Sequence, residues 1–132
     1  LEGADEKRVN TFESVYLENQ GNKTFKMVPL PALAQVSKIM VLRTEDVDKD
    51  GNLDVIVGGN FNGASMYQAR YDAFFGLILK GNGKGGFKTL IPTDTGLLLE
   101  GDIRDIKQVK TTAGILYLVA RNNDKLQVFK KL

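Results

Sequence analysis

The chain consists of short apolar runs separated by clusters of Gly, Asn, Asp and Pro. The runs are rich in β-branched and aromatic residues and end at turn residues, which is the pattern of β-strands. No run keeps an apolar period of 3.6 residues long enough for an ordinary helix. The pattern therefore predicts an all-β chain with strands at residues 14–17, 24–28, 38–44, 53–58, 74–80, 87–91, 102–110, 115–120 and 126–130.

Longer connections interrupt this series of strands at three places. Pro29 and Pro31 end the second strand, so residues 30–35 are expected to cross over, with room for one helical turn. Residues 92–96, which begin with a proline, predict a second crossover, and residues 60–72 form the longest polar connection. Loops of that length are often functional.

An internal repeat organises the strands. Residues 21–26, Gly-Asn-Lys-Thr-Phe-Lys, return as residues 83–88, Gly-Lys-Gly-Gly-Phe-Lys, at an offset of 62 residues between the two phenylalanines. Each copy is followed by a proline-containing crossover, a strand, a turn and a second apolar strand. A repeated unit of four strands is the signature of a propeller blade.

The repeat predicts a partial β-propeller of about two to three four-stranded antiparallel blades. Residues 1–12 would be a loose leader, and residues 13–132 the propeller segment. Within that segment we expect the end of one blade at 13–35, a complete blade at 36–92 and an incomplete last blade at 93–132. Because closed propellers have typically four to eight blades, we expect either a segment of a larger propeller or open faces covered by other copies.

Composition narrows the classes of function. The 132 residues include 18 basic and 16 acidic side chains, a net charge of +2, which gives no electrostatic footprint for nucleic acid. The apolar runs are too short to span a bilayer, so no membrane insertion is expected. Cysteine and histidine are both absent. This excludes disulfides, zinc–thiolate sites and any Ser-His-Asp or Cys-His mechanism within the chain.

The most informative motif is the acidic stretch 46–54, Asp-Val-Asp-Lys-Asp-Gly-Asn-Leu-Asp, between two predicted strands. Four carboxylates at alternate positions repel one another unless a cation compensates their charge. Ca²⁺ takes six to eight oxygen ligands, and alternate residues of a tight loop can direct carboxylates at one centre. Gly51 permits the sharp turn. The predicted ligands are the carboxylates of Asp46, Asp48, Asp50 and Asp54 with the carbonyl of Asn52.

The flanks show that this loop is not an EF-hand. An EF-hand has a helix on each side and a bidentate Glu at loop position twelve, which here is Val57. The runs 39–42 and 55–57 are strand-like instead. The alternative to a calcium site is an Asp-rich, solvated turn that binds no metal. In the second copy, Lys110–Gly114 replaces the acidic loop, so no second metal is predicted there.

The acidic loop followed by Val-Ile-Val-Gly-Gly-Asn-Phe at 55–61 resembles the FG-GAP, or VCBS, repeat of integrin-type β-propellers. Residues 81–87 and 121–129 resemble the C-terminal blades of VCBS-repeat proteins of bacterial cell envelopes. The resemblance implies calcium ligands at the positions named above. It also implies recognition or scaffolding without a shared catalytic set, in an extracellular, cell-surface or periplasmic setting, with an unknown glycan or protein ligand.

Other motifs have weaker functional interpretations. Residues 81–86 satisfy G-x-G-x-x-G, but a strand follows where dinucleotide binding requires a helix, so we predict a hairpin turn. In the long connection, Tyr67, Arg70 and Tyr71 suit a ligand-binding surface. The alternative is that Tyr71 and Phe74 fill the space between blades while Arg70 pairs with Asp72.

An enzyme is the less favoured class. Acidic side chains suit a glycosidase or lyase, and candidates by residue type are Asp94, Glu100, Asp102 and Asp105. No acid/base couple can be recognised among them. We therefore expect a non-enzymatic calcium-binding recognition or scaffold module, with a propeller-type polysaccharide lyase or hydrolase, or a self-assembling structural module, as alternatives.

Overall fold

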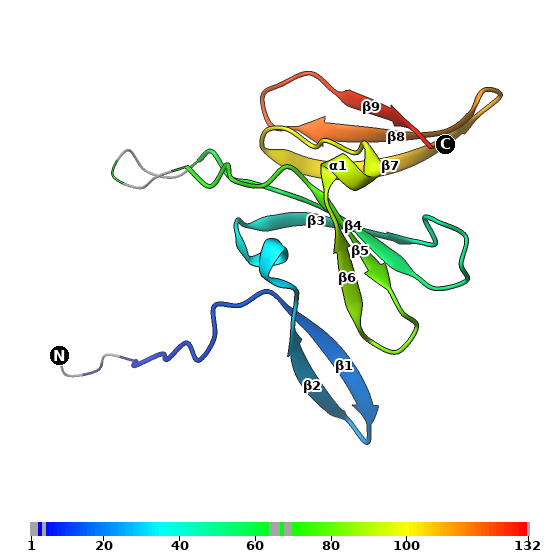
Figure 1. The fold of residues 1–132 in the computed structure, drawn as a ribbon. Helices are drawn as coiled ribbons and strands as arrows, with labels where there is room; N and C mark the ends of the chain where they lie inside the picture. Colours follow the sequence, from blue (N-terminus) through cyan, green and yellow to red (C-terminus); the bar gives the residue numbers. More distant parts are fainter. Residues whose placement is uncertain (1–2, 4, 64–66, 68–69, 132) are drawn as a thin grey trace.

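The computed structural model describes residues 3, 5–63, 67 and 70–131, which form three antiparallel sheets (Figure 1). The sheets have two, four and three strands, each in chain order. The all-β prediction is confirmed, and the predicted strands follow one another as expected. The strands are β1 (Val15–Gly21), β2 (Thr24–Pro29), β3 (Ile39–Glu45), β4 (Asp54–Gly59), β5 (Leu77–Gly81), β6 (Phe87–Leu90), β7 (Ile103–Thr111), β8 (Gly114–Arg121) and β9 (Gln127–Lys130).

Two helical turns lie in the crossovers. The 3₁₀ turn η1 (Ala32–Gln35) occupies the first crossover, as its predicted helical turn suggested. In the second crossover, α1 (Pro92–Thr95) is a turn that the sequence analysis did not predict. The carboxylate of Asp94 accepts the N–H of Ile91 at 3.0 Å, which stabilises the start of α1. Neither described helix has the length or the apolar character needed to cross a membrane.

The strand β5 begins three residues later than predicted, and Asn60 gives the reason. This residue is 2% exposed and directly follows β4. Its side chain donates to the carbonyl of Phe74 at 2.6 Å and accepts the N–H of Phe74 at 3.0 Å. The backbone of Phe74 is therefore bound by a side chain instead of a neighbouring strand. Gly76 then adopts a φ of 78°, which turns the chain into β5.

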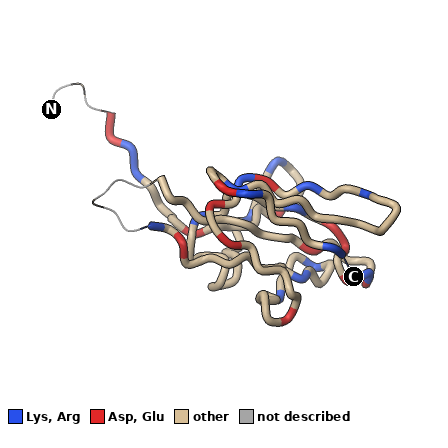
Figure 2. Tube along the Cα trace, turned by 90° about the horizontal axis from the view of Figure 1, so that it is seen from above, with Lys and Arg blue, Asp and Glu red and all other residues tan. Residues whose placement is uncertain are grey.

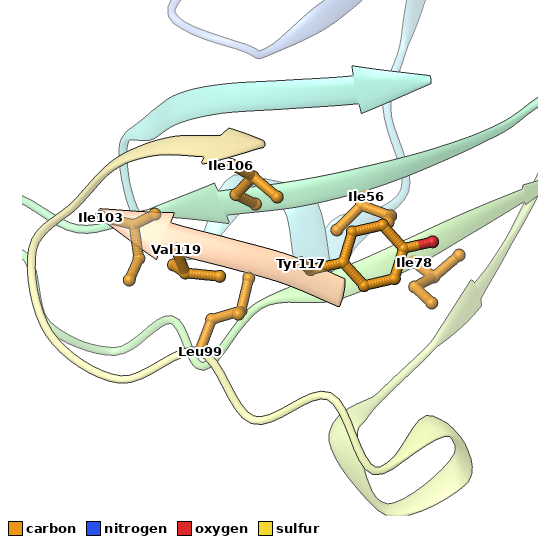
Figure 3. Close-up of a cluster of buried hydrophobic side chains, with 7 residues drawn as sticks. All are labelled: Ile56, Ile78, Leu99, Ile103, Ile106, Tyr117 and Val119. Atoms are coloured by element: carbon orange, nitrogen blue, oxygen red, sulfur yellow. The ribbon is translucent and has the colours of Figure 1, made fainter. Parts of the chain in front are cut away.

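The four-stranded sheet β3–β6 lies between the other two sheets and buries both of its faces (Figure 1). Ile56 and Val57 are neighbours on β4 and point to opposite sides, as strand geometry requires. The face of Ile56 packs against the three-stranded sheet (Figure 3). The buried residues of this first cluster are Ile56, Ile78, Leu99, Ile103, Ile106, Tyr117 and Val119.

The face of Val57 packs against the first crossover and the two-stranded sheet. The buried residues of this second cluster are Ala34, Val57, Phe74, Leu77 and Leu79, and Phe87 of β6 packs against them. Tyr16 of β1 meets the ring of Phe87 edge-on at a centroid distance of 5.8 Å. The β1–β2 hairpin is thus attached to the four-stranded sheet mainly through one aromatic pair and the η1 region.

The described residues form three sheets stacked in sequence, and they close into neither a barrel nor a ring. The four-stranded sheet is a simple antiparallel meander, β3-β4-β5-β6. Its first two strands and those of the third sheet share a local irregularity. The register shifts between Ile39 and Val41 in β3, and between Ile103 and Asp105 in β7.

Replacement of Asn60 tests the connection between the sheets. Asn60 also donates to the carbonyl of Gly101 at 3.1 Å, so one side chain joins β4, the entry to β5 and the entry to β7. We expect Asn60→Ala to lower the free energy of unfolding by about 2 kcal/mol or more, because buried backbone groups lose their partners. Urea denaturation measures this change. Asn62→Ala, at an exposed position, is the matched control and should have little effect; equal stability of the two variants would contradict the assignment.

Candidate metal centre

The acidic loop joins β3 to β4, and its two ends meet at the paired residues Glu45 and Asp54. Within the loop, Lys49 has a φ of 64° and Gly51 a φ of 88°. Two residues in the left-handed region give the chain the sharp reversal that an ordinary extended loop lacks. The predicted strand–loop–strand arrangement is therefore present, and no EF-hand helix flanks the loop in the described residues.

Three carboxylates of the loop come together. One oxygen from each of Asp46, Asp48 and Asp50 lies within 4.8 Å of the others, so the group could hold a metal ion. Asp46 is partly buried and the other two are exposed. The loop's own amides fix these side chains. Asp46 accepts the N–H groups of Asp50 and Gly51, each at 3.0 Å, and Asp50 accepts the N–H of Asn52 at 2.9 Å.

A lysine from β5 compensates part of the negative charge. The Lys80 ammonium contacts the carboxylate of Asp48 and lies 3.1 Å from that of Asp50. Hydrogen bonds to Asp48 and Asp50 raise the pKa of Lys80 above its ordinary value. The pKa of Asp50 is lowered, first by the backbone hydrogen bond from Asn52 and then by Lys80. Both shifts keep the groups charged at neutral pH.

Asp54, the fifth predicted ligand, has different partners. It is 1% exposed, and its two oxygens accept the N–H groups of Val47 and Gly81, each at 2.9 Å. Asp54 thus binds the start of the loop to the end of β5. The Asn52 side chain points back into the loop and donates to Asp50 at 3.0 Å. Of the predicted ligand set, the structure brings three carboxylates into one group and places Asp54 beneath the loop as an anchor.

The donor set has a clear chemical character. Carboxylate oxygens surround the candidate site, and the chain has neither cysteine nor histidine. Such ligands suit hard cations such as Ca²⁺ and Mg²⁺, and not zinc or copper. Mg²⁺ needs near-ideal octahedral geometry, whereas Ca²⁺ accepts irregular loops with carboxylate and carbonyl oxygens. The residues present therefore suit a hard cation that binds oxygen ligands.

A second charged cluster, which the sequence analysis did not predict, adjoins the loop. Glu45, the last residue of β3, accepts hydrogen bonds from Tyr117 of β8, from Arg43 at 3.0 Å and from Lys131 at 2.7 Å. The Lys131 ammonium also donates to the carbonyl of Asp46 at 3.2 Å. This cluster links the acidic loop to the third sheet. Tyr117 and Lys131 lie 72 and 86 residues from Glu45 in sequence, so only folding brings them to it.

The charge on Glu45 depends on these partners. Burial alone would raise the pKa of Glu45, but the hydrogen bonds from Lys131, Tyr117 and Arg43 outweigh it and lower the pKa below 4.5. Burial and the Glu45 carboxylate together raise the pKa of Tyr117. The Glu45 cluster is therefore an ionised carboxylate held by a neutral phenol and two cations.

The predicted ligand-binding residues are not gathered into one site. Tyr67 is 98% exposed and Arg70 is exposed. Tyr71 forms an isolated bridge with Phe61, and the Lys38 ammonium lies over both rings, at 4.7 and 4.4 Å from their centroids. The predicted Arg70–Asp72 ion pair is not found among the described residues. Met66, a further candidate of this connection, lies outside them.

The remaining motifs have structural roles. Residues 81–86 form the turn between β5 and β6, where the Asn82 side chain accepts two backbone N–H groups, so the hairpin interpretation is confirmed. The candidate catalytic acids are not assembled as a pair. Asp102 is buried and pairs with Arg104 at 2.8 Å, Asp105 lies 3.3 Å from Lys107, and Asp94 caps α1. Acidic and basic residues are interspersed along the trace (Figure 2).

Comparisons of the chain with protein-family models, with curated proteins and with solved structures found no match. The function proposed below therefore rests on the chemistry of the site and on the arrangement of the sheets.

The Glu45 cluster predicts a specific pH dependence. Because the pKa of Glu45 is lower in the folded chain than its ordinary 4.5, its ionised form stabilises the fold above that pH. This contribution is lost as the pH falls through the folded-state value. We expect Glu45→Gln to be less stable than the parent chain at pH 7 and to lose less stability between pH 5 and pH 3. Melting curves recorded in EDTA across this range measure it, and parallel pH profiles would contradict it.

Asp54→Ala tests the anchor beneath the loop. Removal of a buried carboxylate that accepts two backbone N–H groups leaves both donors without partners. We expect a loss of about 2 kcal/mol or more in the free energy of unfolding, with EDTA present. Asp72→Ala is the matched control, since Asp72 is an exposed acid outside the loop. A loss seen only when calcium is present would show instead that Asp54 acts purely as a metal ligand.

Proposed function

We propose that this chain is a non-enzymatic, calcium-binding β-sheet module of the FG-GAP/VCBS type that serves recognition or scaffolding outside the cytoplasm. One observation carries the proposal: Asp46, Asp48 and Asp50 converge in the turn between two strands of a well-packed sheet. Three adjacent carboxylates repel one another unless cations compensate their charge, and Lys80 compensates only part of it.

Calcium would complete the loop in a particular way. The three carboxylates supply the first oxygens, and the carbonyl of Asn52 is the proposed fourth ligand. Asp54 is already bound by two amides, but a carboxylate oxygen has a second lone pair, so it can hold the loop and face the ion together. Lys80, which now occupies part of the acidic surface, would have to release Asp48 and Asp50.

The sheet arrangement supports the blade interpretation. The four-stranded meander and the neighbouring sheets stack through both faces of β3–β6, as blades of a propeller do. The two- and three-stranded sheets on either side correspond to parts of such units. The chain would therefore stand as part of a larger propeller, or associate with other copies of itself.

Recognition is favoured over catalysis. Three of the predicted acid/base candidates have structural partners: Asp102 pairs with Arg104, Asp105 pairs with Lys107, and Asp94 caps α1. The exposed side chains of Tyr67, Arg70 and Tyr71 lie on the long connection and suit contact with a glycan or protein ligand. A propeller-type lyase or hydrolase would need an acid/base couple from outside these residues.

The central test is the effect of calcium on thermal stability. We expect about 10 mM calcium to raise the melting temperature relative to EDTA, because an ion that binds only the folded chain stabilises it by about 1.4–2.7 kcal/mol at ten to one hundred times its dissociation constant. For an extracellular module that constant is on the order of 10⁻⁴–10⁻³ M. Asp48→Asn should abolish the shift and Asp72→Asn should retain it. Superimposable curves of the parent chain in calcium and in EDTA would refute the proposal.

Lys80→Gln gives an independent test of the same site. The lysine competes with the metal for Asp48 and Asp50, and its charge would repel a bound cation. We expect the variant to bind calcium more tightly than the parent chain, measured by isothermal titration calorimetry. Lys88→Gln, on the adjacent strand β6 and exposed, is the control. Weaker calcium binding by Lys80→Gln would show that Lys80 supports the site instead of competing for it.

A further inference from the structure

The third sheet has an open edge at β9. This strand is the last of the order β7-β8-β9 and pairs only with β8. The N–H of Lys131 donates to Ile115, at the start of β8, so the N–H groups of Phe129 and Gln127 also point toward β8. Those of Val128 and Lys130 consequently point to the opposite edge, which no described strand occupies.

The second sheet shows which element pairs with the equivalent edge when that edge is covered. Asn60 and Asn122 occupy equivalent positions, because the backbone N–H of Asn60 donates to the carbonyl of Lys38 and that of Asn122 donates to the carbonyl of Asp102. When the second and third sheets are aligned on these asparagines, Val55 of β4 matches Tyr117 of β8. Their partners on the next strands, Leu79 of β5 and Phe129 of β9, are therefore equivalent positions. In the second sheet β6 covers the outer edge of β5 and directs Phe87 toward the first sheet, against Tyr16.

A hollow marks the equivalent place in the third sheet. Its volume is about 450 Å³, and it lies between the second and third sheets. Its walls include Ile78 and Leu90 on one side, and Tyr117 and Phe129 on the other. When the first and second sheets are aligned on Phe25 and Phe87, Ile78 of β5 occupies the position of Tyr16 of β1. Tyr16 is the side chain that Phe87 contacts. A fourth strand beside β9 would therefore direct an aromatic side chain into this hollow.

The chain also carries an unpaired extended segment with a suitable sequence. Residues 5–13, the N-terminal arm, have no strand or helix and are exposed throughout. Their hydrogen bonds in the described structure stay within the arm. Phe12 is 93% exposed. Thr11 and Phe12 of the arm, followed by Val15 at the start of β1, repeat the pattern Thr24-Phe25-x-x-Val28 of β2, the strand that aligns with β6 through Phe25 and Phe87.

We propose that the open edge of β9 and the adjoining hollow accept the N-terminal arm of a second copy of this chain, with Phe12 entering the hollow. Within one molecule the arm leaves from β1, on the opposite side of the four-stranded sheet from β9 (Figure 1). Exchange between copies pairs the arm of one copy, the donor, with the β9 edge of another, the acceptor. The pairing adds main-chain hydrogen bonds and buries about 150–250 Å² on the aromatic ring. The contact is heterologous, so it propagates from copy to copy.

Light scattering coupled to size-exclusion chromatography tests the proposal with two complementary variants. Phe12→Asp removes the donor, and Val128→Pro removes an edge N–H that β8 does not use. The parent chain should gain mass in steps of one chain as its concentration rises. Each variant alone should be monomeric. Their mixture should give a 1:1 dimer and nothing larger, since Phe12→Asp keeps the acceptor and Val128→Pro keeps the donor.

Controls separate this result from misfolding and from other surfaces. Tyr67→Asp changes an equally exposed aromatic residue outside the arm and should associate like the parent chain. Circular dichroism and the calcium-dependent melting shift should be unchanged in Phe12→Asp, so failure here is distinct from failure of the calcium site. If Val128→Pro does not fold, Lys130→Pro or hydrogen exchange at the Val128 amide replaces it.

Three results would overturn the proposal. A parent chain that stays monomeric at every concentration excludes exchange. Phe12→Asp that associates as strongly as the parent chain shows that another surface is used. A mixture of the two variants that yields no 1:1 dimer contradicts the donor–acceptor pairing.

Discussion

The structure depends on one sheet that is apolar on both faces. On β4, Ile56 packs toward the third sheet and Val57 toward the first, so adjacent side chains hold separate layers. Neither outer sheet has an equivalent second partner among the described residues. Leu17 on the first sheet and Val128 on the third remain 55% and 56% exposed. Burial of a large aliphatic side chain contributes about 1.5–3 kcal/mol, so the central sheet provides most of the stability and the flanking sheets depend on it.

The acidic loop is built on this sheet, and its contacts show how its three close carboxylates are accommodated. Backbone amides face Asp46 and Asp50, while Lys80 meets the exposed side of the cluster. The amides are fixed by the turn, but Lys80 is a flexible side chain that can leave. The loop is therefore preorganised by its backbone, and its charge balance is adjustable. On the proposal that the loop binds calcium, the ion would replace Lys80 without refolding of the loop.

The sequence predicted the features that depend on local pattern. Strand positions follow from apolar runs, the hairpin at residues 81–86 from glycine and asparagine, and the acidic cluster from spacing within nine residues. It could not predict contacts between distant segments. Lys80 reaches Asp48 of the loop from 32 residues away, and the Gly81 amide that binds Asp54 lies 27 residues from it. The α1 turn was missed because four residues carry no period to detect.

Non-local contacts also connect the loop to the open side of the molecule. Lys131, just after β9, binds both Glu45 and the carbonyl of Asp46, so the last strand and the first ligand share one side chain. Tyr117, whose hydroxyl reaches Glu45, forms part of the wall of the hollow beside β9. A chain of contacts through Lys131, Glu45 and Tyr117 therefore connects the acidic loop to the end of β9 and to the wall of the hollow.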